Sequence, residues 1–156
     1  MQYIAGGVCA PKGFKAAGVH CGIRRNRSKY DLALIVSDEL ASAAAVYTQN
    51  LVKGAPILVT QKHLENGYAR AVIVNSGNAN TCNANGIEIA EGMCALVREY
   101  TGIREEDVAV ASTGVIGQPL SLQPISDGMQ SLVDALSPDG SVDAANAIMT
   151  TDTLLK

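Results

Sequence analysis

The sequence predicts an α+β fold, with mixed β-sheets flanked by helices, formed by residues 1–156 as a single domain. Short apolar runs separated by turn signals fill the first half and are typical of strands. Apolar residues at helical spacing dominate the second half. The fold class follows from this change of period along the chain.

The strands are expected mainly in the first half. Turn signals separate the apolar runs at Ser37-Asp38, Lys53-Gly54 and Glu65-Asn66-Gly67. These runs therefore predict adjacent strands in a mixed or antiparallel sheet. The predicted strands are 31–36, 44–48, 56–60 and 71–74, with a later one at 108–111.

Helices are predicted by apolar residues that recur every three or four positions. The first runs from Ile87 to Tyr100 and carries charged residues on its opposite side. A second is expected after Ser121, a favourable N-cap residue, and Pro124 fits its first turn. A third is predicted over 142–149, after a turn at 137–140.

Composition excludes several classes of function. The formal net charge is -3, and the chain has one Phe and no Trp, so we expect no nucleic-acid binding. No apolar stretch approaches the ~20 residues that span a bilayer, and the start of the chain does not resemble a signal peptide. We therefore expect a cytoplasmic protein that does not bind a membrane.

The cysteines and histidines match no metal-binding pattern. We expect Cys9, Cys21, Cys82 and Cys94 to be reduced thiols that act as small buried hydrophobic residues. His20 is not expected to activate Cys21, because neighbouring residues in a strand point to opposite faces.

Polar residues follow two of the predicted strands. Five asparagines lie between Asn75 and Asn85, and Ser112-Thr113-Gly114 follows the strand at 108–111. Asn and Gly tolerate left-handed backbone, so such segments can turn sharply and direct amides at a ligand. The same residues are also typical of plain turns and helix caps. Taken together, the two units predict one site where the strands end.

Thr113 and Gly114 offer a hydroxyl and a backbone amide, which suit the oxygen that becomes negative during acyl transfer. Neither loop contains a carboxylate, and no sequence pattern of an activated nucleophile is present. We therefore expect another chain to supply the attacking group. The basic segment 24–29 could attract a phosphate-bearing substrate, although a solvated turn is the favoured interpretation.

Five segments occur in a specific order that covers nearly the whole chain. They are 13–19 (GFKAAGV), 31–35 (DLALI), 74–80 (VNSGNAN), 111–117 (ASTGVIG) and 148–153 (IMTTDT). Together they resemble the α chain of the ornithine acetyltransferase (ArgJ) family. The resemblance implies a DmpA/ArgJ-like fold, made as one precursor that cleaves itself before a threonine. That threonine becomes the N-terminus of a β chain and carries the acetyl group.

The resemblance also implies the reaction. Family members transfer acetyl from N-acetylornithine to glutamate in arginine biosynthesis, and some also use acetyl-CoA. Neither a metal nor a bound organic cofactor is implied, and an α2β2 heterotetramer is expected. Thr113 and Gly114 match the oxyanion-stabilising pair of the family, and Thr150-Thr151 matches a substrate-binding position that either threonine could provide.

The end of the chain departs from the family pattern. The chain stops at Lys156, ahead of a lysine-containing segment and of the cleavage threonine, so we expect an α chain shortened at its tail. Two alternatives remain open. One is a subunit of a related self-processing aminopeptidase or amidase, in which water replaces glutamate as acceptor. The other is a non-catalytic subunit that binds an amino acid or anion through the asparagine-rich loop.

Overall fold

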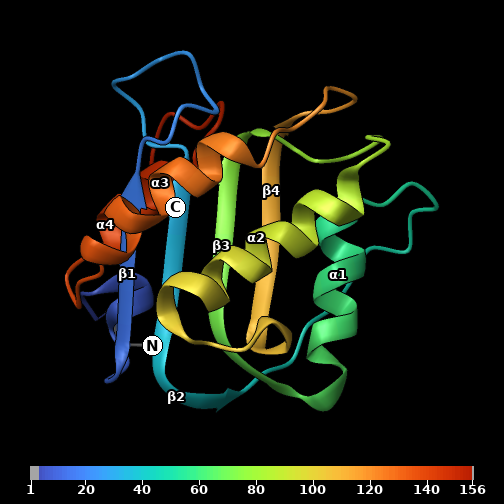
Figure 1. The fold of residues 1–156 in the computed structure, drawn as a ribbon. Helices are drawn as coiled ribbons and strands as arrows, with labels where there is room; N and C mark the ends of the chain where they lie inside the picture. Colours follow the sequence, from blue (N-terminus) through green and yellow to red (C-terminus); the bar gives the residue numbers. More distant parts are fainter. Residues whose placement is uncertain (1–3, 156) are drawn as a thin grey trace.

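The protein is built around a four-stranded sheet (Figure 1). The computed structural model describes residues 4–155. Along the sheet, β1 and β2 are antiparallel, β2 and β3 are antiparallel, and β3 and β4 are parallel. The predicted mixed sheet is therefore confirmed. The strands are β1 (Phe14–Val19), β2 (Leu32–Ser42), β3 (Tyr68–Asn78) and β4 (Val108–Val115).

Within the described residues 4–155, four helices and three short 3-10 turns surround the sheet. Helices α2 and α3 cross one face, and α1 lies beside the edge strand β4 (Figure 1). Helix α4 packs mainly on β1 and β2. The helices are α1 (Ala55–His63), α2 (Gly86–Thr101), α3 (Gln123–Asp134) and α4 (Ser141–Ile148), and the 3-10 turns are Gly7–Cys9, Leu64–Asn66 and Glu105–Asp107.

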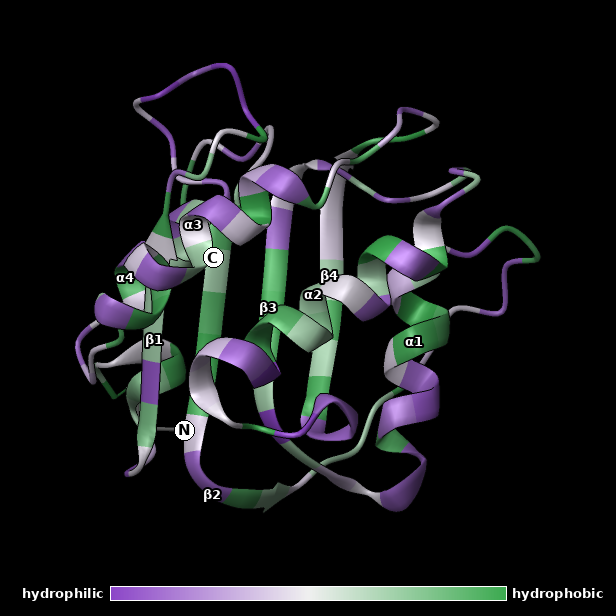
Figure 2. Cartoon of the chain, in the orientation of Figure 1, coloured by the Kyte–Doolittle hydropathy of each residue, from purple (hydrophilic) through white to green (hydrophobic). Residues whose placement is uncertain are grey.

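The core has two parts because successive strand residues point to opposite faces. The larger part joins the sheet to α2 and α3, and its largest buried side chains include Leu32, Leu34, Ile73, Met93 and Met129. The smaller part lies under α4 and consists of alanines: Ala16, Ala33, Ala144 and Ala147. Figure 2 shows the matching hydropathy pattern, with hydrophobic residues along the strands and hydrophilic ones in the loop between β1 and β2.

Residues 56–60 form part of α1, so the strand predicted there is wrong. Pro56 is tolerated in the first turn of a helix, where its missing N–H has no partner to lose. The Thr60 hydroxyl donates to the Val110 carbonyl at 2.7 Å and accepts from the Val110 N–H at 2.8 Å. Helix α1 thus satisfies the free edge of β4 instead of adding a strand to it.

The strand predicted at 44–48 is also wrong. This segment is irregular, and the Val46 side chain is 99% exposed. The predicted turn at Ser37-Asp38 lies inside β2, where the pairing with β3 shifts register between Val36 and Ala41. β1 was not among the predicted strands.

The predicted N-cap of α3 is misplaced by one residue. The helix begins at Gln123, and its N-cap position is Leu122. The Ser121 hydroxyl still accepts a hydrogen bond from the Gln123 N–H at 3.2 Å, so it satisfies one of the free donors at this helix end. The turn at Glu65-Asn66-Gly67 is confirmed, with Gly67 in left-handed conformation at φ 76°.

Candidate functional site

The two polar segments meet at one end of the sheet. Because β3 and β4 are parallel, their final residues lie side by side: Ser76 pairs with Thr113, and Gly77 pairs with Gly114. These strand ends lie at the upper edge of the sheet in Figure 1, beside the loops that follow them. The predicted meeting of the two strand-to-helix units is confirmed, although Asn75 and Asn78 belong to β3 itself.

Gly114 allows an unusually close approach of the two strands. A Cβ atom at this position would lie 2.4 Å from the Gly77 carbonyl carbon and 2.6 Å from the Asn78 nitrogen. Its φ of 137° is also one that residues with a side chain rarely adopt. Glycine is therefore required here, and it places an exposed stretch of backbone directly after Thr113.

The hydroxyls beside Gly114 differ in their partners. Ser112 Oγ donates to Asn75 Oδ1 at 2.5 Å, and Ser76 Oγ donates to the carbonyl oxygen of Ala147. Within residues 4–155, the half-buried Thr113 hydroxyl makes no hydrogen bond. Thr113 therefore keeps a free donor at the edge of the sheet.

The asparagine side chains bind the protein's own backbone. Asn75 Nδ2 donates to the Asn78 carbonyl at 2.9 Å, and Asn78 Nδ2 donates to the Gln118 carbonyl at 3.0 Å. Asn80 is fully buried, has a left-handed φ of 46°, and donates to the Gly86 carbonyl at 2.8 Å. The expectation that these amides point at a ligand is wrong for these three residues. They brace the loop that joins β3 to α2.

Thr150 and Thr151 follow α4 and reach the same edge of the sheet through their neighbours. The Arg24 guanidinium donates to the Met149 carbonyl, and Ser76 binds the end of α4 at Ala147. In the described residues, neither Thr150 nor Thr151 is hydrogen bonded to Thr113 or Gly114. The predicted site residues therefore share one edge of the sheet, without direct polar contact between the two pairs.

Arg24 was missed as a single residue by the sequence analysis. Its side chain lies over Gly77, since a Cβ on Gly77 would be 2.9 Å from Arg24 Cγ. The available signal was the basic segment 24–29, which was favoured as a solvated turn. Ser76 was missed as well, and its contact with α4 has no local sequence signal because Ala147 lies 71 residues away.

Asp31 fixes the loop that carries Arg24. It is fully buried and lies directly before β2. Its carboxylate accepts hydrogen bonds from the backbone N–H groups of Cys21 at 2.7 Å and Arg24 at 2.8 Å, and from Gly22 at 3.3 Å. His20 Nδ1 lies 3.2 Å from the same carboxylate. A carboxylate with several backbone donors holds a turn firmly.

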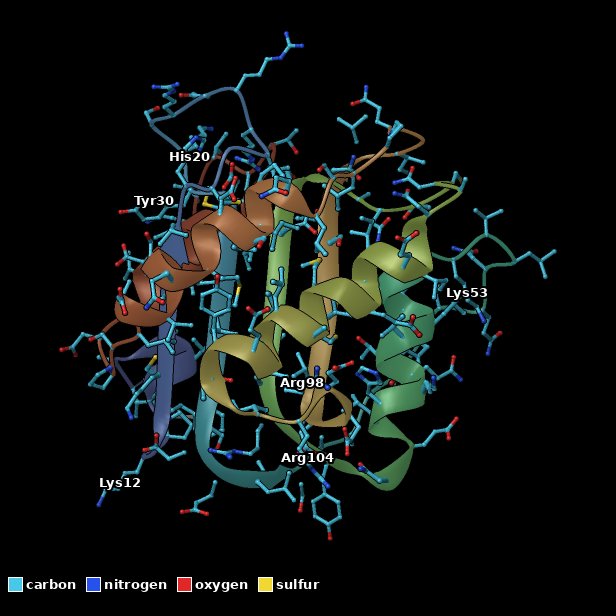
Figure 3. All side chains as sticks on the ribbon, in the orientation of Figure 1. Lys12, His20, Tyr30, Lys53, Arg98 and Arg104 are labelled. Atoms are coloured by element: carbon cyan, nitrogen blue, oxygen red, sulfur yellow. The ribbon has the colours of Figure 1, made fainter. Side chains whose placement is uncertain are left out.

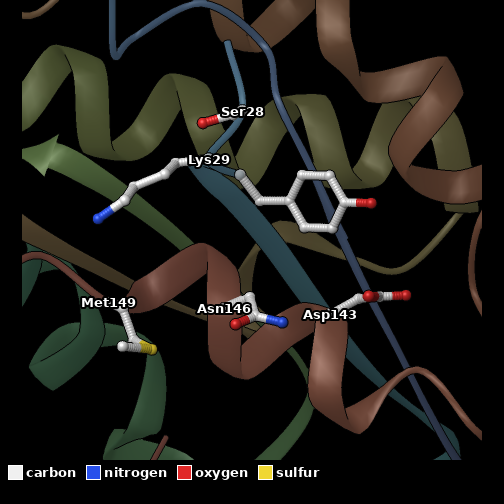
Figure 4. Close-up of a pocket in the computed structure, with 6 residues that line it drawn as sticks. Ser28, Lys29, Asp143, Asn146 and Met149 are labelled. Carbon is white, nitrogen blue, oxygen red and sulfur yellow. The ribbon is translucent and has the colours of Figure 1, made fainter. Parts of the chain in front are cut away.

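Two polar pockets flank this loop. Figure 4 shows the first, of about 360 Å³, with Asp143 and Asn146 on α4 and Ser28 and Lys29 on the facing segment. Met149 closes one side, directly before Thr150. The second pocket, of about 550 Å³, is lined by His20, Cys21, Gly22, Arg24, Arg25 and Arg27.

The thiols of Cys21 and Cys94 are not activated. Burial, reinforced by the charge of Asp31, raises the pKa of Cys21 to about 12, and burial raises the pKa of Cys94 to about 12. His20 and Cys21 follow β1 rather than lying in a strand, so the geometric reason given for their independence is wrong. All four cysteines are free, but only Cys94 is buried. Cys9 and Cys21 are partly exposed and Cys82 is exposed, contrary to the expectation of buried thiols.

Among residues 4–155, no three His, Cys, Asp or Glu side chains gather where they could hold a metal ion. No helix in that range is both long and apolar enough to cross a membrane.

Comparison with known proteins places the chain in a family. The ArgJ family model matches residues 15–156. The arginine biosynthesis bifunctional protein ArgJ of Caldanaerobacter subterraneus is 49% identical over 157 residues, which cover 100% of this chain and 38% of that protein. The protein of the same name from Bacillus subtilis is 47% identical, with 98% and 37% covered. The chain thus spans well under half the length of these curated relatives.

Solved structures agree with the observed fold. The crystal structure of ArgJ from Bacillus halodurans matches with a TM-score of 0.88 and 42% identity, covering 96% of this chain and 78% of that one. Ornithine acetyltransferase of Mycobacterium tuberculosis, complexed with ornithine, matches with a TM-score of 0.87 and 40% identity, covering 97% and 83%. The predicted α+β fold of ArgJ type is confirmed. This chain is a member of the ArgJ family.

Proposed function

We propose that this chain is the α-chain part of an acetyltransferase that moves acetyl from N-acetylornithine to glutamate in arginine biosynthesis, and that also accepts acetyl-CoA. A β chain from the same precursor would supply its N-terminal threonine as the nucleophile, in a cytoplasmic α2β2 assembly. Membership of the ArgJ family supports this proposal. The ornithine bound to the Mycobacterium tuberculosis relative points to the same substrate class.

The observation that carries the proposal is the free Thr113 hydroxyl at the end of two parallel strands, directly before an exposed glycine. Its neighbours Ser76 and Ser112 are engaged within the chain. Fixed donors of this kind stabilise an oxyanion with little reorganisation. Neither polar segment contains a carboxylate, and the burial of Cys21 keeps that thiol protonated. The attacking group would therefore come from the β chain.

The reaction would proceed in two halves. The β-chain threonine hydroxyl attacks the acetyl carbonyl of N-acetylornithine, and its α-amine takes the hydroxyl proton. Thr113 and the Gly114 amide would stabilise the negative oxygen, and the proton would pass to the leaving amine of ornithine. The glutamate amine would then attack the acetyl ester and release the threonine. No metal or bound cofactor takes part in this scheme.

Substrate positioning would fall to the segment after α4. Thr150 or Thr151 would contact the amino-acid substrate, since this segment meets the edge of the sheet through the Arg24 contact with Met149. The adjoining pocket of about 360 Å³ offers Lys29 and Asp143, which suit the carboxylate and ammonium groups of an amino acid.

Replacement of Thr113 tests the proposal. Thr113→Ala should lower kcat about 10²- to 10³-fold, the usual effect of losing one oxyanion donor, and should leave KM nearly unchanged. Thr113→Ser keeps the hydroxyl and should retain most of the activity. Processing into two chains must be verified first, because self-cleavage could use the same donors. A fully processed Thr113→Ala enzyme with normal kcat would refute the assignment.

The choice of acceptor separates this enzyme from a related aminopeptidase or amidase. Acetylglutamate should form in proportion to the N-acetylornithine consumed, and consumption should nearly stop without glutamate. Equal consumption with and without glutamate would instead identify a hydrolase. A purely binding subunit is disfavoured, because Asn75, Asn78 and Asn80 direct their amides at backbone carbonyls.

A further inference from the structure

The loop between β1 and β2 concentrates positive charge, and the proposed function assigns no role to Arg25 or Arg27 within it. Arg24, Arg25, Arg27 and Lys29 lie within six residues of a chain whose net charge is -3. The loop projects beyond the end of the sheet and is hydrophilic (Figures 1 and 2). His20 and Tyr30 lie near its two ends (Figure 3). Such local excess charge attracts anions to one place on the surface.

This charge borders a cavity whose lining contains no carboxylate. The pocket of about 550 Å³ is bordered by three arginines and His20. Asp31 is not part of the lining: it is fully buried, lies 3.2 Å from His20 Nδ1 and accepts hydrogen bonds from backbone N–H groups of the loop. Within residues 4–155, Arg25 and Arg27 form no ion pair, and both are exposed. Their guanidinium groups are therefore available to a ligand.

The loop is also fixed in shape. Asp31 binds its first half, as described above. In its second half, Asn26 Oδ1 accepts hydrogen bonds from the Ser28 N–H at 3.1 Å and the Ser28 hydroxyl at 2.8 Å. The Lys29 N–H donates to the Asn26 carbonyl at 3.2 Å. Arg25 and Arg27 flank this braced residue, so less backbone freedom is lost when a ligand binds.

Arg24 connects the pocket to the candidate site. Its side chain borders the pocket and also lies over Gly77, the pairing partner of Gly114. Arg24 therefore links the pocket to the strand end that carries the proposed oxyanion donors. Guanidinium groups bind carboxylates as well as phosphates in bidentate pairs, but the amino-acid substrates offer only one or two carboxylates and no phosphate. Three neighbouring arginines match a ligand with several phosphate oxygens.

We propose that Arg25 and Arg27, with His20, bind the phosphate groups of a phosphorylated acyl thioester whose acyl group reaches Thr113. Phosphate binding by the loop does not depend on the proposed function, but delivery of the acyl group rests on it. Charge-assisted hydrogen bonds to phosphate give the site its affinity, and the rigid loop sets the position of the ligand.

Calorimetric titration of the intact, processed complex tests the site with three probes: coenzyme A, inorganic pyrophosphate and pantetheine, which has no phosphate. The double variant Arg25→Gln/Arg27→Gln should bind coenzyme A and pyrophosphate about 10- to 100-fold more weakly. The affinity for pantetheine should be the same in the variant and the wild-type complex. In steady-state kinetics, the double variant should increase KM for both acetyl donors by different factors. The fold increase should be at least ten times larger for acetyl-CoA than for N-acetylornithine.

A matched variant controls for net charge. Lys12→Gln/Lys62→Gln removes the same charge from two exposed lysines, and Lys12 lies at the far end of the molecule (Figure 3). The proposed phosphate site would be overturned if both double variants weakened the binding of coenzyme A and pyrophosphate equally. It would also be overturned if the arginine double variant did not weaken that binding. Binding of pyrophosphate but not of coenzyme A would overturn the acyl-donor assignment. Normal phosphate binding in a complex that transfers no acetyl would refute the proposed function and leave the phosphate site standing.

Discussion

Gly114→Ala should destabilise the protein far more than a glycine substitution usually does. The new methyl group would lie 2.4 to 2.8 Å from backbone atoms of Gly77 and Asn78, so β3 and β4 would have to separate. Strain at φ 137° contributes about 1–3 kcal/mol, and the overpacking adds about 1–3 kcal/mol. The free energy of unfolding should therefore fall by about 2–6 kcal/mol.

Gly117→Ala provides the control for this measurement. Gly117 also has positive φ, at 74°, but an added Cβ would meet no atom within 4 Å. It should lose only about 1–2 kcal/mol through backbone strain. Urea-induced unfolding, followed by circular dichroism, gives both values. If the two variants lose the same free energy within about 0.5 kcal/mol, the close approach of the strands at Gly114 is refuted.

Three further predictions concern residues away from the oxyanion donors. Thr60→Val leaves both polar groups of Val110 without their partner and should reduce the free energy of unfolding by about 1–3 kcal/mol in urea titrations. Asn80→Ala removes the buried brace of the loop and should speed amide hydrogen exchange there, as read by mass spectrometry; unchanged exchange would contradict the bracing role. Alkaline pH should destabilise the fold through Cys21 and Cys94, because their folded pKa of about 12 exceeds the ordinary 9.0, so the unfolded state loses protons first. Stability should be unaffected by these thiols below about pH 9 and fall by up to about 1.4 kcal/mol per pH unit and thiol towards pH 12; simultaneous thiolate absorbance and unfolding measurements check this.

Periodicity was sufficient for most of the fold and insufficient at both edges of the sheet, where β1 was not predicted and α1 was predicted as a strand. The helices at 86–101 and 123–134 are clear from sequence because each must present one apolar face to the sheet. The run at 56–60 is short and apolar, and such runs do not distinguish a strand from a buried helix segment. Whether this run forms a helix or a strand depends on the contact of Thr60 with Val110, which lies 50 residues away in the sequence.

The meeting of the two polar segments was predictable from sequence, and the contacts of their side chains were less so. Two strands followed by polar segments and helices indicated a shared edge, and the parallel pairing of β3 with β4 brings these segments together, with Thr113 beside Ser76. The roles of the asparagines were not predictable, because a buried amide and a ligand-binding amide have the same local sequence. The role of Asp31 was likewise not predicted, because this residue begins an apolar run and has no local polar pattern. Its carboxylate nevertheless accepts the hydrogen bonds that fix the basic loop.

The central claim is that this chain stabilises an acetyl transfer whose nucleophile lies on another chain. Intact mass spectrometry of the purified enzyme, after brief incubation with N-acetylornithine and no glutamate, tests it directly. The account predicts one acetyl group on a second chain that begins with threonine, none on residues 1–156, and loss of that acetyl when glutamate is added. Acetyl on residues 1–156, or transfer to glutamate without such a second chain, would contradict it.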